Sequence, residues 1–145
     1  MRLVLQRVTR SEVRVGGAVV AGGGPGLLIL VGIGVDDRDD EPAKLAEKVW
    51  HLRIFEDEQG KMNRSLEDVG GDVVVVPQFT LYGDTSRGRR PSWIRAAPPE
   101  VANGRVEGFA AALASLGARV HTGVFREHME VELVNDGPVT LVLEA

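Results

Sequence analysis

The chain has 145 residues, of which 43% are hydrophobic and 26% charged, and its formal net charge is −4. This length fits a single domain, residues 1–145, and the composition is that of a packed globule rather than a disordered chain. The absence of cysteine excludes disulfides, thiolate metal sites and a cysteine nucleophile. The negative net charge gives no overall indication that the protein binds nucleic acid.

No segment predicts export or membrane insertion. The first ten residues alternate apolar and polar side chains and do not read as a signal peptide. The longest apolar stretch, residues 27–35, contains two glycines and is too short to span a bilayer. We therefore expect a cytoplasmic protein with no membrane partner.

The first third of the sequence predicts β-strands. Apolar and polar residues alternate at 3–5 and again at 13–15, and Gly16-Gly17 predicts a turn into a returning strand at 18–21. The nearly continuous apolar run 26–33 predicts a strand that is covered on both faces.

Two later segments predict helices. Pro42 suits a first helical turn, and Leu45, Val49 and Leu52 follow it at helical spacing. A second helix is expected from about Pro98-Pro99 to a C-terminal cap at Gly117. Its apolar positions are Val106, Phe109, Ala110 and Leu113.

The remaining strands are predicted at 73–76, continuing through Leu81, and at 119–122. Residues 129–134 and 139–143 flank Asn135-Asp136-Gly137-Pro138 as two arms of a turn. Strands outnumber helices, which predicts an α+β fold: a mostly antiparallel, partly barrel-like sheet with two main helices packed on it.

The usual catalytic signatures are missing. The three histidines show no metal-ligand spacing, and the sequence contains no nucleophile elbow, phosphate-binding loop or dinucleotide motif. Arg87, Arg89 and Arg90 lie in a stretch without acidic residues, which indicates either a solvated loop or contacts to a phosphate backbone.

Two segments are unusual for a pure scaffold. In Pro77-Gln78-Phe79-Thr80-Leu81, amide and hydroxyl groups flank a phenylalanine at the end of a strand. In Asn135-Asp136-Gly137-Pro138-Val139-Thr140, glycine before proline gives a stiff turn. Taken alone, the spacing of the first segment favours an ordinary strand with a polar outward face, and the second segment is simply a tight loop between two strands.

Together these segments resemble the D-aminoacyl-tRNA deacylase family, which is marked by a Ser-Gln-Phe-Thr-Leu type motif and an Asn-x-Gly-Pro-Val-Thr type motif. Matching stretches run through nearly the whole chain in order. They are Gln6-Arg7-Val8-Thr9-Arg10, Arg53-Ile54-Phe55, Gly60-Lys61-Met62-Asn63, Arg90-Pro91-Ser92 and Gly123-Val124-Phe125. The departure is Pro77, where the family usually has serine, so a hydroxyl and a backbone donor are absent here.

The resemblance implies a homodimeric hydrolase that needs no metal or organic cofactor and acts on the 3′-terminal aminoacyl-adenosine of aminoacyl-tRNA. Gly137-Pro138 would be cis and would reach into the pocket of the partner subunit, with Arg7 fixing that segment. The residues implied to be catalytic are Gln78, Phe79 and Thr80. Phe125 and Met129, together with Gly137, Pro138 and Arg7, are implied to bind the substrate and select its handedness. Arg87, Arg89 and Arg90 would contact the tRNA backbone.

For the chemistry, we favour an oxyanion hole near Phe79 and Thr80 over covalent attack by the Thr80 hydroxyl, because no base is evident to activate it. The Gly137 and Pro138 carbonyls would collide with an L side chain and admit a D one, and misacylated glycyl-tRNA would also enter. The alternative is a non-catalytic dimeric module that binds RNA ends; a plain structural dimer comes third.

Overall fold

A computed structural model describes residues 1–145, and its sheet is built around one long strand, β1 (Arg2–Val15). Strand β8 (Glu130–Glu144) pairs antiparallel along one edge of β1 over nearly its whole length. On the other edge, β3 (Gly26–Gly32) pairs with the first half of β1, and β2 (Ala18–Gly23) with the second half. The predicted turn at Gly16-Gly17 joins β1 to β2.

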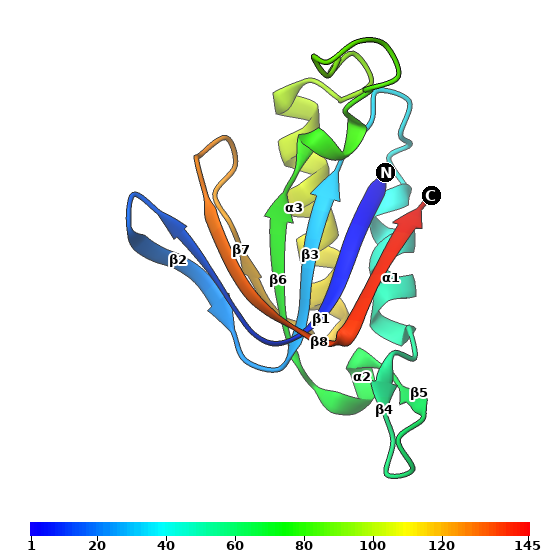
Figure 1. Cartoon of the computed structure of the whole chain (residues 1–145). Helices are drawn as coiled ribbons and strands as arrows, with labels where there is room; N and C mark the ends of the chain where they lie inside the picture. The colour runs from blue at the N-terminus through cyan, green and yellow to red at the C-terminus, as the bar shows by residue number, and fades with distance from the viewer.

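Two further strands extend the sheet in parallel. β6 (Asp72–Pro77) lies beside β3, and β7 (Arg119–Thr122) lies beside β6, which gives the order β2-β1-β3-β6-β7 with β8 on β1. Parallel neighbours need a crossover connection, and the helical segments between these strands supply it. The ends of the sheet curl toward each other, so that β2 lies close to β6 and β7 and the sheet nearly closes into a barrel (Figure 1).

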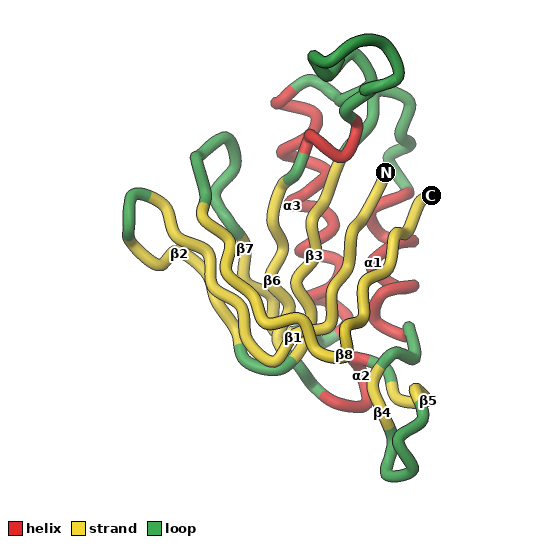
Figure 2. The backbone as a smooth tube through the Cα atoms, in the orientation of Figure 1, coloured by secondary structure: helices red, strands yellow, loops and turns green.

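Two main helices cover one face of the sheet (Figures 1 and 2). Helix α1 (Glu41–His51) has Pro42 in its first turn, and α3 (Pro99–Leu116) ends at Gly117 with φ 113°, the left-handed cap that favours glycine. The predicted α+β class, with a partly barrel-like sheet and two main helices packed on it, is confirmed.

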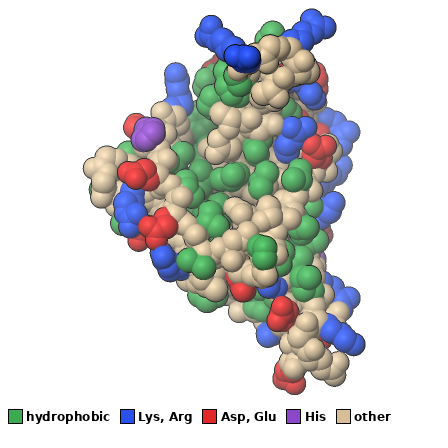
Figure 3. All heavy atoms as spheres, viewed as in Figure 1, with side chains coloured by type: hydrophobic (Ala, Val, Ile, Leu, Met, Phe, Trp, Pro, Cys, Tyr) green, Lys and Arg blue, Asp and Glu red, His purple; other side chains and the backbone are tan.

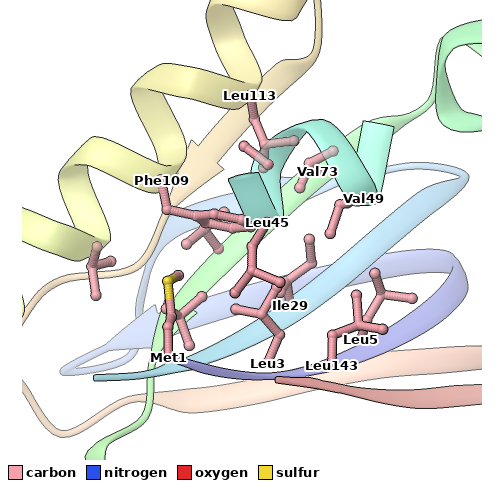
Figure 4. Packing of buried hydrophobic residues seen from close by; sticks show 14 of the residues in the cluster. Met1, Leu3, Leu5, Ile29, Leu45, Val49, Val73, Phe109, Leu113 and Leu143 are labelled. Carbon is pink, nitrogen blue, oxygen red and sulfur yellow. The ribbon is translucent and has the colours of Figure 1, made fainter. Parts of the chain in front are cut away.

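The core lies between this face and the helices. Side chains from alternate positions of β1 and β3 meet residues of α1 and α3 that recur at helical spacing (Figure 4). Leu3, Ile29, Val49 and Phe109 are all fully buried. A second, smaller cluster lies on the opposite, concave side of the sheet, at the end where β2 and β7 curl over.

The small elements were not all predicted. A short hairpin, β4 (Phe55–Glu56) with β5 (Met62–Arg64), and the single turn α2 (Leu66–Val69) connect α1 to β6. The strand predicted to run through Leu81 is wrong beyond Pro77, because η1 (Phe79–Tyr82) is a 3-10 turn. No helix combines the length and the apolar character needed to cross a membrane.

The prediction that Asn135-Asp136-Gly137-Pro138 forms a turn between two strands is also wrong. Its two arms do not fold back on each other; both pair with β1 as parts of the single strand β8. The register jumps from Gln6↔Thr140 to Val8↔Asn135, so the four residues 136–139 bulge out opposite Arg7. A bulge of this kind redirects side chains and interrupts the ladder without ending the strand.

Candidate functional site

A cavity of about 830 Å³ opens where β6 ends, between η1, residues 93–99 and residues 125–131. Most of its lining is apolar, and the ends of β3 and α3 contribute to it. The volume is in the range of small-molecule and cofactor sites. Of the residues predicted for the site, the structure brings four to this cavity: Gln78, Phe79, Phe125 and Met129.

Gln78 and Phe79 are placed by the transition from β6 into η1. The Gln78 backbone N–H donates to the Val31 carbonyl at 2.8 Å, which extends the ladder by one bond. The chain then turns, and Leu81 N–H donates back to the Gln78 carbonyl at 3.3 Å. In a 3-10 turn each backbone N–H donates to the carbonyl three residues earlier, and the first such donor here is Leu81. The N–H groups of Phe79 and Thr80 come before it, so the turn does not use them.

Thr80 is exposed and does not line the cavity. Its hydroxyl accepts a hydrogen bond from the Gln78 side-chain amide, which ties the two predicted residues together. Gln78, just before η1, and Phe79, its first residue, therefore line the cavity, whereas Thr80 does not line it and is hydrogen-bonded to Gln78.

Contacts on the far side of η1 hold it in place. The Tyr82 hydroxyl donates to Asp37 at 3.2 Å, and Arg2 lies 5.1 Å from the centre of the Tyr82 ring. Arg2 also donates to the Leu81 carbonyl at 2.6 Å. Burial, followed by the neighbouring Asp37 carboxylate, raises the pKa of Tyr82, so the phenol stays protonated as a donor.

The cavity has an aromatic wall that the sequence did not predict. The rings of Phe79 and Trp93 meet edge to face, with centroids 5.2 Å apart. Gly83 lets them approach, since a Cβ there would lie 2.7 Å from the Trp93 ring. Ile94, also in the wall, is 85% exposed. The sequence does contain a signal for this wall, because an aromatic and an aliphatic residue, Trp93 and Ile94, directly follow a polar loop.

Phe125 and Met129 enter the cavity lining from the segment between β7 and β8. Gly123 N–H donates to the Val75 carbonyl at 2.9 Å and so fixes this segment to the end of β6. A Cβ on Gly123 would lie 2.8 Å from the Met129 sulfur, so Met129 packs closely against the backbone here. Residues more than forty positions apart in sequence thus line one cavity.

Arg87, Arg89 and Arg90 are exposed and belong to the loop at the top of Figure 1, and Lys and Arg side chains gather at that end in Figure 3. Reciprocal backbone hydrogen bonds of 2.9 Å between Asp84 and Ser92 close the base of the loop. The three arginines do not line the cavity, and the loop leads directly into Trp93.

The Gly137–Pro138 peptide bond is cis and lies in the β8 bulge. Arg7 is buried beneath it, donating to the Asp136 carbonyl at 3.2 Å and to the Ile54 carbonyl at 2.6 Å. Gly137 has φ 124°, and a Cβ there would lie 2.9 Å from Val139 and 3.1 Å from Arg7. Both Gly137 and Pro138 are exposed.

This bulge does not reach the cavity of its own chain. Arg7, the β1 residue opposite the bulge, pairs with Leu27 on β3, and Leu27 pairs with Val73 on β6. Gln78 lies about 16 Å further along the strand direction, and β8 is three strand spacings from β6. The two predicted parts of the site are therefore roughly 20 Å apart within one chain. No three His, Asp or Glu side chains are grouped where they could hold a metal ion.

Comparisons with known proteins place this geometry in a family. Residues 4–144 match the family model described as D-Tyr-tRNA(Tyr) deacylase. The chain is 57% identical to D-aminoacyl-tRNA deacylase from Heliobacterium modesticaldum over 99% of this chain and 96% of that protein. It is also 57% identical to the same enzyme from Roseiflexus sp., over 100% and 94% of the two chains. The solved structure of a c-Myc DNA Unwinding Element Binding Protein superposes with a TM-score of 0.94 at 37% identity, covering 100% of this chain and 99% of that one.

Proposed function

This chain belongs to the D-Tyr-tRNA(Tyr) deacylase family and is a D-aminoacyl-tRNA deacylase, and from this premise we propose separate roles for its cavity and its β8 bulge. The cavity beside η1 binds the aminoacylated 3′-terminal adenosine of the tRNA. The Gly137–Pro138 segment of a second copy enters that cavity and excludes L-amino acids. The observation that carries this proposal is the meeting of Gln78, Phe79, Phe125 and Met129 in one cavity.

The lining suits a nucleoside ester. Phe79 and Trp93 offer aromatic surfaces for a base, and stacking of this kind is worth about 1–3 kcal/mol per base. Phe125 and Met129 provide further apolar lining, and Gln78 contributes a polar group. The volume of about 830 Å³ accommodates adenosine together with an amino acid side chain.

The backbone donors of Phe79 and Thr80 supply the electrostatic part of the reaction. Water attacks the ester carbonyl carbon, and the resulting oxyanion accepts hydrogen bonds from these N–H groups. The carbonyl then re-forms and the bond to the ribose 3′ oxygen breaks, with the proton passing to that oxygen, which releases free amino acid and tRNA. The neighbouring ribose 2′-OH is placed to assist.

A homodimer accounts for the distance between the two parts of the site. Val4, Leu30 and Val142 alternate with core residues, so they lie on the sheet face away from the helices, and Val142 is 62% exposed. Apolar side chains gather on this face in Figure 3. An apolar sheet face without a covering layer is suited to a self-complementary contact with a second copy. In such a dimer, the exposed bulge of each chain is available to the cavity of the other.

In such a dimer, the enzyme selects the handedness of the amino acid by sterically excluding L side chains. Arg7 and the packing around Gly137 hold the bulge rigidly, so its carbonyls are fixed where an L side chain would project. Each tenfold of rejection needs about 1.4 kcal/mol, which a steric clash supplies readily. Glycine has no side chain to reject, so mischarged glycyl-tRNA is a further substrate under this proposal.

The arginine loop extends the contact to the tRNA backbone. Arg87, Arg89 and Arg90 carry no acidic partner and adjoin the cavity wall through Trp93. Phosphate contacts supply most of the sequence-independent affinity for nucleic acid. Because charged tRNA is its substrate, we place the protein in the cytoplasm.

The direct test uses the purified protein with D-tyrosyl-tRNA, L-tyrosyl-tRNA and glycyl-tRNA. Release of amino acid is expected from the D and glycyl forms, with the L form spared. Equal cleavage of the D and L forms would contradict chiral exclusion. Binding of all three without turnover would instead identify a non-catalytic module for RNA ends.

A further inference from the structure

Arg126 has an unusual position in the wall of the cavity. It is the only residue other than glycine with a positive φ, 66°, and it lies between Phe125 and Met129, which both line the cavity. Few non-glycine residues adopt this left-handed conformation. The turn is closed by a hydrogen bond of 3.3 Å from Glu127 N–H to the Val124 carbonyl.

The charge of Arg126 is not neutralised within the chain. Its side chain is exposed and forms neither an ion pair nor a hydrogen bond, although Glu127, the next residue, also lines the cavity. It is also the one arginine or lysine that lines the cavity. Several arginines elsewhere are paired with carboxylates: Arg2, Arg10, Arg14, Arg105 and Arg119.

We propose that Arg126 binds the phosphate that joins the terminal adenosine to the preceding nucleotide, and so positions the single-stranded 3′ end of the tRNA. This inference rests on the proposed function. A nucleoside seated between Phe79 and Phe125 must leave the cavity through its 5′ oxygen, and the first group outside is a phosphodiester. An unpaired guanidinium on the cavity wall matches this anion in charge and in its paired donors.

The arrangement gives Arg126 a role distinct from that of the arginine loop. Arg87, Arg89 and Arg90 lie outside the cavity and are suited to phosphates further along the acceptor strand. Arg126 lies in the cavity lining itself, next to Phe125, where a single phosphate would adjoin the bound nucleoside. It is a positioning residue, because it acts on the orientation of the ester rather than on the reacting atoms.

The test compares substrates with and without that phosphate. Arg126→Gly removes the side chain while keeping a residue that favours φ 66°. We expect kcat/KM for D-tyrosyl-tRNA to fall about tenfold, the effect of losing one charge-assisted hydrogen bond. For the D-tyrosyl ester of adenosine, which has no phosphate, the loss should disappear. Arg126→Lys should recover part of the activity on D-tyrosyl-tRNA.

A second readout is the salt dependence. Arg126→Gly leaves one phosphate of the single strand without its cation, so the slope of log(kcat/KM) against log[salt] should become shallower by about 0.7. Lys48→Ala is the matched control, since Lys48 is an exposed, unpaired cation on α1, away from the cavity. It should leave the slope and both substrates unaffected.

The outcomes separate this inference from the proposed function. Equal losses on both substrates, or no loss on D-tyrosyl-tRNA, would overturn the phosphate role of Arg126 while leaving the deacylase site intact. Failure of the unaltered protein to cleave either substrate would overturn the proposed site itself, and the role of Arg126 with it.

Discussion

The Thr80 hydroxyl accepts a hydrogen bond from the Gln78 amide, and no titratable side chain is bonded to it. A nucleophilic hydroxyl needs an adjacent base or a depressed pKa to react with an ester at useful rates. No such base is bonded to the Thr80 hydroxyl, and Thr80 lies outside the cavity lining. These contacts favour main-chain stabilisation of the oxyanion over covalent catalysis.

Thr80→Val tests this directly, because valine keeps the β-branched shape and leaves the backbone N–H in place. We expect single-turnover deacylation of D-tyrosyl-tRNA to slow by no more than about tenfold, the effect of losing one hydrogen bond. A hydroxyl acting as the nucleophile would instead make the loss about a million-fold, as in serine hydrolases.

Pro77 is the one position where the marked motif departs from the family pattern. It lines the cavity at the end of β6, and it offers neither a hydroxyl nor an N–H. Any contact that a serine makes there in relatives is absent from this chain. Gln78 N–H still extends the ladder to Val31, so the strand end keeps its geometry.

At the scale of elements, the sequence predicts most of the architecture because local patterns decide it. Helical spacing after a proline identifies α1 and α3, a glycine marks the end of α3, and a continuous apolar run identifies β3. The β8 bulge could not be predicted in the same way. A glycine and a proline between two alternating segments fit a hairpin and a bulge equally, and only pairing with β1 distinguishes them.

The loop of residues 83–92 carries a prediction about tRNA affinity. We expect Arg87→Ala combined with Arg89→Ala to weaken tRNA binding and to reduce its salt slope by about 0.7 to 0.9 for each phosphate that an arginine no longer neutralises. The matched control is Lys48→Ala with Lys61→Ala, which removes two exposed, unpaired cations elsewhere. If both double variants kept the original slope in titrations over a salt series, the loop would be only a solvated surface.

Asp72 joins three elements at the start of β6. Its carboxylate accepts hydrogen bonds from Arg119 of β7 at 2.8 Å and from Gly24 N–H, after β2, at 2.9 Å. The hydrogen bond from Arg119 is the main cause that holds the pKa of Asp72 below its ordinary value, against the opposing effect of burial. A depressed folded-state pKa stabilises the protein above the unfolded pKa, and this stabilisation is lost as the pH falls through the folded value.

Asp72→Asn should therefore lower the free energy of unfolding by about 1–3 kcal/mol at pH 7. The difference from the unaltered protein should shrink as the pH falls from about 4 through the folded-state pKa of Asp72, below which the carboxyl is protonated in both states. Urea denaturation at several pH values measures this, with the exposed Asp36→Asn as control. A difference that is constant with pH would show that the carboxylate charge contributes nothing.

For the molecule as a whole, the sequence predicts the members of the site better than their arrangement. Gln78, Phe79, Phe125 and Met129 share a cavity because β6 and the segment before β8 end at the same edge of the sheet. Trp93 was missed because its place depends on Gly83 and on the fold of the loop, which are contacts that no local pattern encodes. The separation of the bulge from the cavity is likewise a property of the sheet.

That separation is the basis for placing the Gly137–Pro138 segment in a second copy, and exchange of subunits between two variants tests it most directly. Gly137→Ala should displace the bulge, because its Cβ would lie 2.9 Å from Val139 at φ 124°. Its dimers should then cleave both D- and L-tyrosyl-tRNA. Phe79→Asp should inactivate the cavity while leaving the bulge intact, since Phe79 is 56% exposed.

In mixed dimers formed with an excess of Phe79→Asp chains, each working cavity belongs to a Gly137→Ala chain and faces an unaltered bulge from its partner. We predict that cleavage of L-tyrosyl-tRNA falls as these dimers form, while cleavage of D-tyrosyl-tRNA persists. Cleavage of L-tyrosyl-tRNA that stays constant per Gly137→Ala chain would contradict selection of handedness across the subunit boundary.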